Sequence, residues 1–274
     1  MVCGMATYRV NQAGAVGVIT PADMRPYEPP PNAWSRVDNI RFLNGAAQAS
    51  NGWIQLDVDI DAELLITPSH ISWFGNEADT WWILWADNKI RTYSGSTSDL
   101  VNSTVSSTWP QQIWSTCNFI GTVVGTNNAD VPQAQYNAGN AVVRATPIAD
   151  MPNWPTDEKC LVLRPLKNYL VAINITTATG QQLANIVRWS HPADPGFLPS
   201  SWAYDDPTTL AGQTVLGAGD GQLIAAELLR DDLIIYSEYS THRMSFIGGQ
   251  YIFQFDEIFH NVGAFGQNAV AEFD

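Results

Sequence analysis

The side chains best suited to hold a metal ion are four carboxylates at every second position near the start of the chain: Asp57, Asp59, Asp61 and Glu63. Alternation with apolar neighbours predicts a β-strand that carries all four carboxylates on one face. A calcium loop of the EF-hand type starting at Asp57 would need Gly at its sixth position and Glu at its twelfth. The chain has Ala62 and Pro68 there. We therefore interpret the segment as a solvated strand face and predict no metal site.

Ser190, His191 and Asp194 are the residue types of a hydrolase triad, and they lie close together in the sequence. The stretch from Trp189 to Gly196 also contains two prolines and a glycine, which favour a rigid turn. The chain has no G-x-S-x-G nucleophile motif. A glycoside hydrolase would need two facing carboxylates, and the sequence identifies no such pair. We predict a protein without catalytic residues, which is not an enzyme.

The sequence also contains no motif that is typical of cofactor binding. The glycine-rich stretch Gly217–Gly221 has neither the spacing of a dinucleotide loop nor the Lys-Ser/Thr of a phosphate loop, so it predicts a flexible connection. Cys3, Cys117 and Cys160 are odd in number and widely spaced, which indicates neither a disulfide framework nor a zinc site. The four histidines are not at the spacing of metal ligands. We predict no cofactor.

The charge balance argues against nucleic-acid binding. The chain has 13 Lys+Arg against 27 Asp+Glu, a formal net charge of −14, and phosphate contacts need clustered basic residues. An acidic protein can still line a passage that repels DNA, although acidity also serves solubility alone. The N-terminal residues Met1–Val10 have no apolar core of a signal peptide, and the apolar run Trp81–Ala86 is too short to span a bilayer. We predict no membrane insertion.

The elements that would position these side chains are strands. Charged residues make up only 15 %, and Asn, Thr, Ser, Gly and aromatic residues are abundant, which favours an all-β fold. Apolar strands that end in short polar turns begin near Trp81, Phe119, Asn168 and Leu233. Such repetition predicts a β-propeller-like array of antiparallel sheets with long loops, and a β-sandwich is the alternative. Two short segments have the composition of helices: Asp157–Leu163 and Gln222–Leu229.

Two regions are expected along the chain. Residues 1–53 combine a proline-rich arm, Pro26–Pro31, with a first hairpin that turns at Asn44-Gly45. Residues 54–274 form the propeller-like domain. The last segment, Asn268–Asp274, has the pattern of the first strand of another unit, so we expect the array to be incomplete by itself at its C-terminal end. Three alternatives follow: the N-terminal segment closes the ring, a partner supplies strands, or the chain is part of a longer product.

Five segments follow one another along the chain: NAWSRVDNIRFLNG at 32–45, LRPLKNYLVA at 163–172, VRWSHPADPG at 187–196, LRDDLIIY at 229–236, and the segment from Val262 to Asp274. Together, and in this order, they resemble the tail nozzle or tail tubular proteins of short-tailed (podovirus-type) phages. The resemblance implies a structural β-propeller subunit of the virion tail. It also implies a ring, usually of six copies, that lines the channel for genome ejection. Family members are generally much longer than this chain.

The resemblance implies further partners and a location. The subunit would contact the tail adaptor and the tail fibre or spike proteins, DNA would pass through without specific binding, and assembly would take place in the host cytoplasm. The alternative function is a carbohydrate- or receptor-binding propeller of a virion or cell surface, in which exposed aromatic rings stack on sugars. Its candidate residues are Trp73, Trp81, Trp85 and Trp109.

Overall fold

The computed structural model describes residues 40–43, 46–49, 68–75, 80–86, 89–93, 101–105, 113–137, 142–217, 219, 221–249 and 251–271. The chain divides into two compact units, Met1–Leu56 and Asp57–Asp274. In the first unit, β1 (Ile40–Leu43) pairs with β2 (Ala46–Ala49) in antiparallel register, as the predicted hairpin requires. The carboxylate ladder at 57–63 and the proline-rich arm lie outside the described residues.

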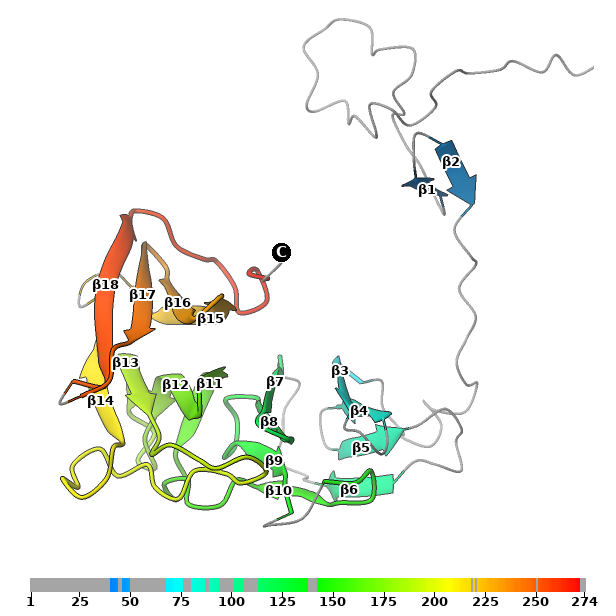
Figure 1. The fold of residues 1–274 in the computed structure, drawn as a ribbon, viewed down its shortest axis with the longest axis horizontal. Coiled ribbons are helices and arrows are strands. Elements are labelled where there is room, and N and C mark those ends of the chain that lie inside the picture. The colour runs from blue at the N-terminus through cyan, green and yellow to red at the C-terminus, as the bar shows by residue number, and fades with distance from the viewer. Residues whose placement is uncertain are drawn as a thin grey trace, which may run out of the picture. The chain divides into compact units, whose positions relative to one another are not determined.

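In the second unit, the described residues form sixteen strands in four successive four-stranded antiparallel sheets, and each sheet uses four consecutive strands (Figure 1). Sheet 1 contains β3 (His70–Gly75), β4 (Thr80–Trp85), β5 (Lys89–Tyr93) and β6 (Val101–Val105). Sheet 2 contains β7 (Ser115–Phe119), β8 (Thr122–Thr126), β9 (Gln133–Gln135) and β10 (Ile148–Asp150). Sheet 3 contains β11 (Lys159–Leu166), β12 (Tyr169–Thr176), β13 (Gln182–Trp189) and β14 (Gly212–Val215). Sheet 4 contains β15 (Leu223–Leu229), β16 (Asp232–Ser237), β17 (Ser240–Phe246) and β18 (Phe253–His260).

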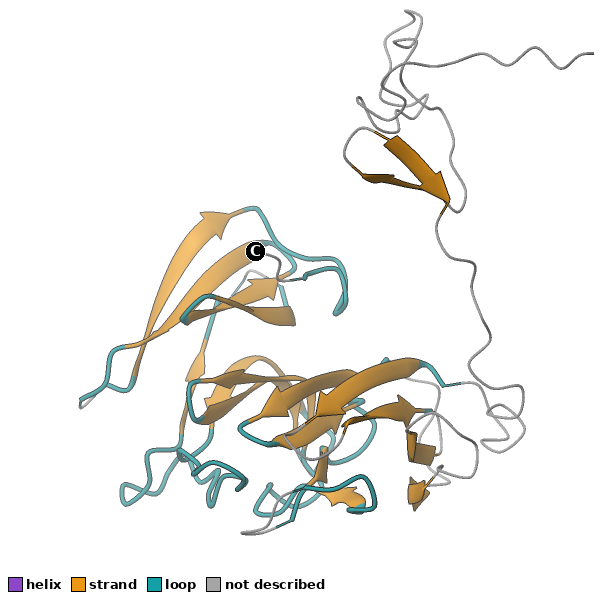
Figure 2. Ribbon diagram, turned by 45° about the vertical axis from the view of Figure 1, so that its right-hand side comes forward, coloured by secondary structure: helices purple, strands orange, loops and turns teal. Residues whose placement is uncertain are grey.

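The predicted all-β, propeller-like array is confirmed, since the sheets follow one another along the chain and none of the sheets in the described ranges closes into a barrel. The described residues form strands, turns and loops without a helix (Figure 2). Both helix predictions were therefore wrong. Residues of Asp157–Leu163 enter β11, and Gln222–Leu229 supplies β15. Leu, Ala and Glu favour helices locally, but pairing with β12 and β16 and burial against the next sheet override that preference.

No helix suited to crossing a bilayer occurs in the described part of the chain.

The turn between the first and second strands recurs in sheets 2, 3 and 4. At each of these turns one non-glycine residue has a positive φ: Ile120 (35°), Lys167 (57°) and Arg230 (58°). Left-handed residues of this kind let a short connection reverse the chain between twisted strands. The Lys167 ammonium also pairs with the carboxylate of Asp231, which links the turn of sheet 3 to that of sheet 4.

The core lies between the sheets. Three apolar clusters fill the junctions between sheets 1 and 2, sheets 2 and 3, and sheets 3 and 4. Successive residues on one strand serve different junctions: Val123 packs with sheet 1 and Val124 with sheet 3. In sheet 3, Leu163 packs toward sheet 2, whereas Val162 packs toward sheet 4. Sheets 2 and 3 are thus buried on both faces.

Large indole rings fill the first of these junctions. Trp81 and Trp85 are fully buried there, and the Trp85 and Trp114 ring centroids lie 4.9 Å apart. The Trp81 Nε1–H donates to Gln135 Oε1 at 3.0 Å, so its one polar group is satisfied across the junction. Part of the high tryptophan content therefore serves packing between sheets.

Gly125 is expected to be intolerant of a side chain. A Cβ at this position would lie 2.7 Å from the buried ring of Trp85. Gly125→Ala should overpack the junction and destabilise the fold by about 1–3 kcal/mol. Urea unfolding followed by tryptophan fluorescence measures this change. Gly266→Ala is the control, because a Cβ there meets no atom within 4 Å. Equal stability of the two variants would contradict the tight contact.

Candidate functional site

A largely buried arginine, Arg164 on the first strand of sheet 3, contacts both neighbouring sheets. Its Nε and Nη2 groups both donate to Glu227 Oε2 at 3.1 Å, and its Nη1 donates to Ser115 Oγ at 2.8 Å. Glu227 lies on β15 and Ser115 on β7, so one guanidinium joins the first strands of three sheets. The Arg164 side chain is only 11 % exposed, which strengthens these charge-assisted bonds relative to water.

His70 extends this polar cluster to sheet 1. Its Nε2 shares a hydrogen bond of 2.9 Å with Thr116 Oγ1 on β7. Burial, and secondarily the positive charge of Arg164, lower the pKa of His70 below its ordinary value. The imidazole is therefore neutral near pH 7. Every one of these residues lies on the first strand of its sheet. We therefore use the name first-strand polar cluster for His70, Ser115, Thr116, Arg164 and Glu227.

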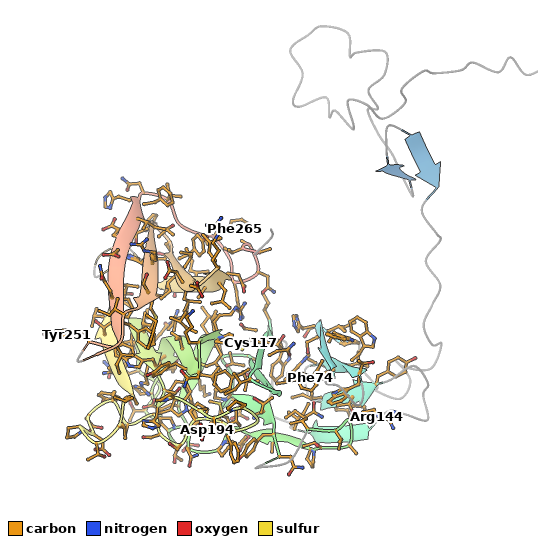
Figure 3. The ribbon with its side chains drawn as sticks, viewed as in Figure 1. Phe74, Cys117, Arg144, Asp194, Tyr251 and Phe265 are labelled. Carbon is orange, nitrogen blue, oxygen red and sulfur yellow. The ribbon has the colours of Figure 1, made fainter. Side chains whose placement is uncertain are left out.

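The cluster has no activated nucleophile. Cys117, labelled in Figure 3, lies next to Thr116 on β7, and burial raises the pKa of its thiol to about 12. Burial likewise raises the pKa of the Cys160 thiol to about 12. Both thiols are free and stay protonated at neutral pH, whereas nucleophilic cysteines need a lowered pKa. The hydrogen bonds and the ion pair of the cluster join neighbouring sheets.

The structure does not assemble the Ser190–His191–Asp194 trio. Ser190 is fully buried, and its Oγ donates to the backbone carbonyl of His191 at 2.8 Å. The His191 Nδ1 accepts a hydrogen bond from the Leu210 backbone N–H at 3.1 Å. The Asp194 carbonyl accepts from the Phe197 N–H, which closes the turn that the prolines and glycine predicted. Each polar group thus shapes the loop between β13 and β14.

A serine–histidine pair does occur elsewhere, and sequence reasoning missed it. Ser240 Oγ lies 2.7 Å from His242 Nε2, and Ser237 Oγ lies 2.8 Å from Ser240 Oγ. All three residues are buried, so no substrate reaches the hydroxyls. The i, i+2 spacing of Ser240 and His242 on a predicted strand was the available signal, since it places both side chains on one face. The group holds the β16–β17 turn.

The tryptophans proposed to stack on sugars separate into two groups. Trp81 and Trp85 are fully buried, so their assignment as carbohydrate contacts was wrong. Trp73 is 51 % exposed and lies directly opposite Trp82, itself 42 % exposed, across the β3–β4 pair. Trp109 lies outside the described residues. The exposed pair forms the aromatic part of the outer face of sheet 1, the face turned away from sheet 2.

The glycine-rich stretch lies in a connection between two sheets. Gly217, Gly219 and Gly221 have positive φ and connect β14 to β15. Among the described residues, no group of three or more His, Cys, Asp or Glu side chains is placed to hold a metal ion.

Comparisons with known proteins add no assignment. No protein-family model matches the chain, and no curated protein matches it significantly.

Removal of the guanidinium should weaken several sheet contacts at once. In Arg164→Met, Glu227 loses its cation and Ser115 loses a donor, and we expect a loss of about 2–4 kcal/mol in unfolding free energy. Urea denaturation of the single and double variants with Glu227→Gln gives the coupling energy between the two residues. Arg243→Met is the control, since its partner Asp256 lies on the surface. A coupling energy of zero would contradict the bridging role.

The lowered pKa of His70 should make stability depend on pH. The unfolded chain takes up the proton near the ordinary value of 6.5, before the folded protein does. The contribution of neutral His70 is therefore fully present above that pH and is lost as the pH falls toward the lower folded pKa. Glutamine does not titrate in this range. Between pH 7.5 and 5, about the range over which histidine titrates, the unfolding free energy of His70→Gln should therefore fall less than that of the wild-type protein. Identical pH profiles would contradict the assignment.

Proposed function

We propose that this chain is a ring-forming structural subunit of the tail nozzle of a short-tailed phage, and that it lines the channel for genome ejection. The observation that carries the proposal is where the family-like motifs lie. LRPLKNYLVA forms the β11–β12 turn and the adjoining half of each strand, and LRDDLIIY forms the β15–β16 turn and nearly all of β16. The two motifs therefore occupy equivalent places in consecutive sheets, and Lys167 and Asp231 join their turns.

The order of the sheets supports a propeller for this subunit. We interpret the four sheets as consecutive blades, each a meander of four neighbouring strands. The first strands β7, β11 and β15 pack beside one another, as the innermost strands of adjacent blades do. Burial of the interior sheets on both faces makes a stiff wall, which suits a conduit that holds its shape during DNA passage.

The charge of the chain supports passage without retention. At −14 per copy, a ring multiplies the negative potential that faces duplex DNA, so DNA is repelled and not bound. The proposal assigns the protein to the virion tail, after assembly in the host cytoplasm, with the tail adaptor and the tail fibre or spike proteins as its neighbours. It assigns no catalytic residue and no cofactor.

Electron microscopy and light scattering of the purified chain test this function, alone and with its tail partners. We expect closed rings with a central opening, with six copies as the expected number. An electrophoretic shift assay at about 150 mM salt should show duplex DNA unretained. A chain that stays monomeric with its tail partners well above micromolar concentration, or that binds duplex DNA tightly, would contradict the proposal.

A second candidate is a carbohydrate-binding propeller, and the exposure of Trp73 and Trp82 favours it. Aromatic rings that are half exposed and adjacent can stack on sugar rings. Glycan-array binding that is lost in Trp73→Ala and Trp82→Ala, but kept in Phe265→Ala, would favour this candidate. Phe265 is a suitable control because it is 95 % exposed and lies outside sheet 1.

A further inference from the structure

The three junctions inside the chain follow one rule: the face of one sheet packs on the opposing face of the next. In the third junction, for example, Val171 and Ile173 of sheet 3 pack with Leu233, Ile235 and Met244 of sheet 4. Sheets 1 and 4 stand at the two ends of this series. Each uses one face in a junction, and the composition of its other face indicates what that face can contact.

The outer face of sheet 1 presents three large exposed side chains. Ile71 and Trp73 alternate along β3, and Trp82 lies opposite Trp73 on β4, with exposed fractions of 53 %, 51 % and 42 %. Their neighbours on the strands, Phe74 and Trp81, point to sheet 2 and are buried. We call these three residues the aromatic face. Exposed tryptophans in such a group are typical of protein contacts, where they provide much of the binding energy.

The outer face of sheet 4 contains an open hollow of about 540 Å³. Its lining combines three aliphatic and four charged residues: Leu229, Ile234, Ile258, Arg230, Asp231, Asp232 and Arg243. Ile234 is 5 % exposed, and its neighbours on β16, Leu233 and Ile235, point to sheet 3. An apolar floor with a charged rim is the usual composition of a protein-binding hollow. We call it the sheet 4 hollow.

We propose that the aromatic face of one copy docks into the sheet 4 hollow of a second copy. The contact would be a fourth sheet-on-sheet junction. As in the three junctions inside the chain, the face of one sheet would pack on the opposing face of the next, here sheet 4 of one copy on sheet 1 of the other. An indole ring in the hollow would contact Leu229 and Ile258, the two exposed aliphatic residues of its lining. The guanidinium groups of Arg230 and Arg243 would lie within reach of its π face. This inference rests on the proposed ring-forming role and names the two surfaces through which neighbouring copies would contact each other.

The dependence of association on salt distinguishes this contact from one that is formed by ion pairs. Two copies of net charge −14 repel each other, so the attraction must come from apolar burial and from the two arginines. Added salt screens the repulsion between the copies. Association should therefore strengthen between low and moderate ionic strength, in contrast to association through surface ion pairs.

The two surfaces differ, so the contact is head-to-tail. A head-to-tail contact leaves one aromatic face and one hollow free in every dimer, so it continues into a ring or a chain of subunits. A symmetric contact between two aromatic faces would instead stop at a dimer. Mixing experiments distinguish these arrangements.

Sedimentation velocity of the full chain up to about 100 µM, a range that detects weak self-association, tests the proposal. Trp73→Asp and Leu229→Asp should each lower the association constant at least about tenfold, and Phe265→Asp should not. A mixture of Trp73→Asp with Leu229→Asp should form a complex of two copies and stop there, because one intact face and one intact hollow remain. Circular dichroism and urea unfolding confirm that each variant folds, and Ile71→Asp replaces Trp73→Asp if that variant does not.

Four results would overturn the docking: monomers of wild type throughout the range, association unchanged in either Asp variant, no complex in the mixture, or loss of association with added salt. Its failure is distinguishable from failure of the nozzle function. Rings that persist in both Asp variants would be compatible with the nozzle function and would exclude this contact. Open chains that dissociate in both variants and form the two-copy complex support the contact and exclude the ring.

Discussion

A sheet in the middle of this array has no side that faces water, and the rest of the structure depends on that constraint. Adjacent residues on β8 and β11 must both be apolar, as in Val123-Val124 and Val162-Leu163. Burial of each such side chain contributes about 1.5–3 kcal/mol. A charged residue on a strand of these middle sheets therefore needs a partner of opposite charge, as Arg164 has in Glu227 and Arg188 has in Glu158. The low charged fraction of the chain is a direct expression of this arrangement.

Polar groups that enter the junctions fix how one sheet lies on the next. The Thr126 hydroxyl donates to the Cys160 carbonyl at 2.7 Å across the second junction. The Asn174 amide donates to the Leu223 carbonyl at 2.9 Å across the third. Apolar packing alone tolerates small slides between sheets, whereas a buried donor without its acceptor costs about 1–3 kcal/mol. These bonds therefore select one position for each pair of sheets.

Local pattern was sufficient to predict strands and hairpins, since alternation and short polar turns are properties of neighbouring residues. It failed for Leu223–Leu229, where a helix-favouring composition lies in a strand because pairing partners decide the conformation. The buried state of Trp81 and Trp85 was equally unpredictable, because it depends on sheet 2, whose position the sequence does not state. Arg164 and Glu227 are 63 positions apart, so no local signal joined them.

The consecutive order of strands within each sheet has a consequence for synthesis on the ribosome. A meander can form as soon as its own four strands have emerged, because none of its partners waits for a distant part of the chain. Each finished meander then offers a prepared face on which the next can condense, and the growing chain adds layers in the order in which they are translated. The array is thus a template for its own extension, and the exposed tryptophans of sheet 1 emerge before any later sheet of the same chain.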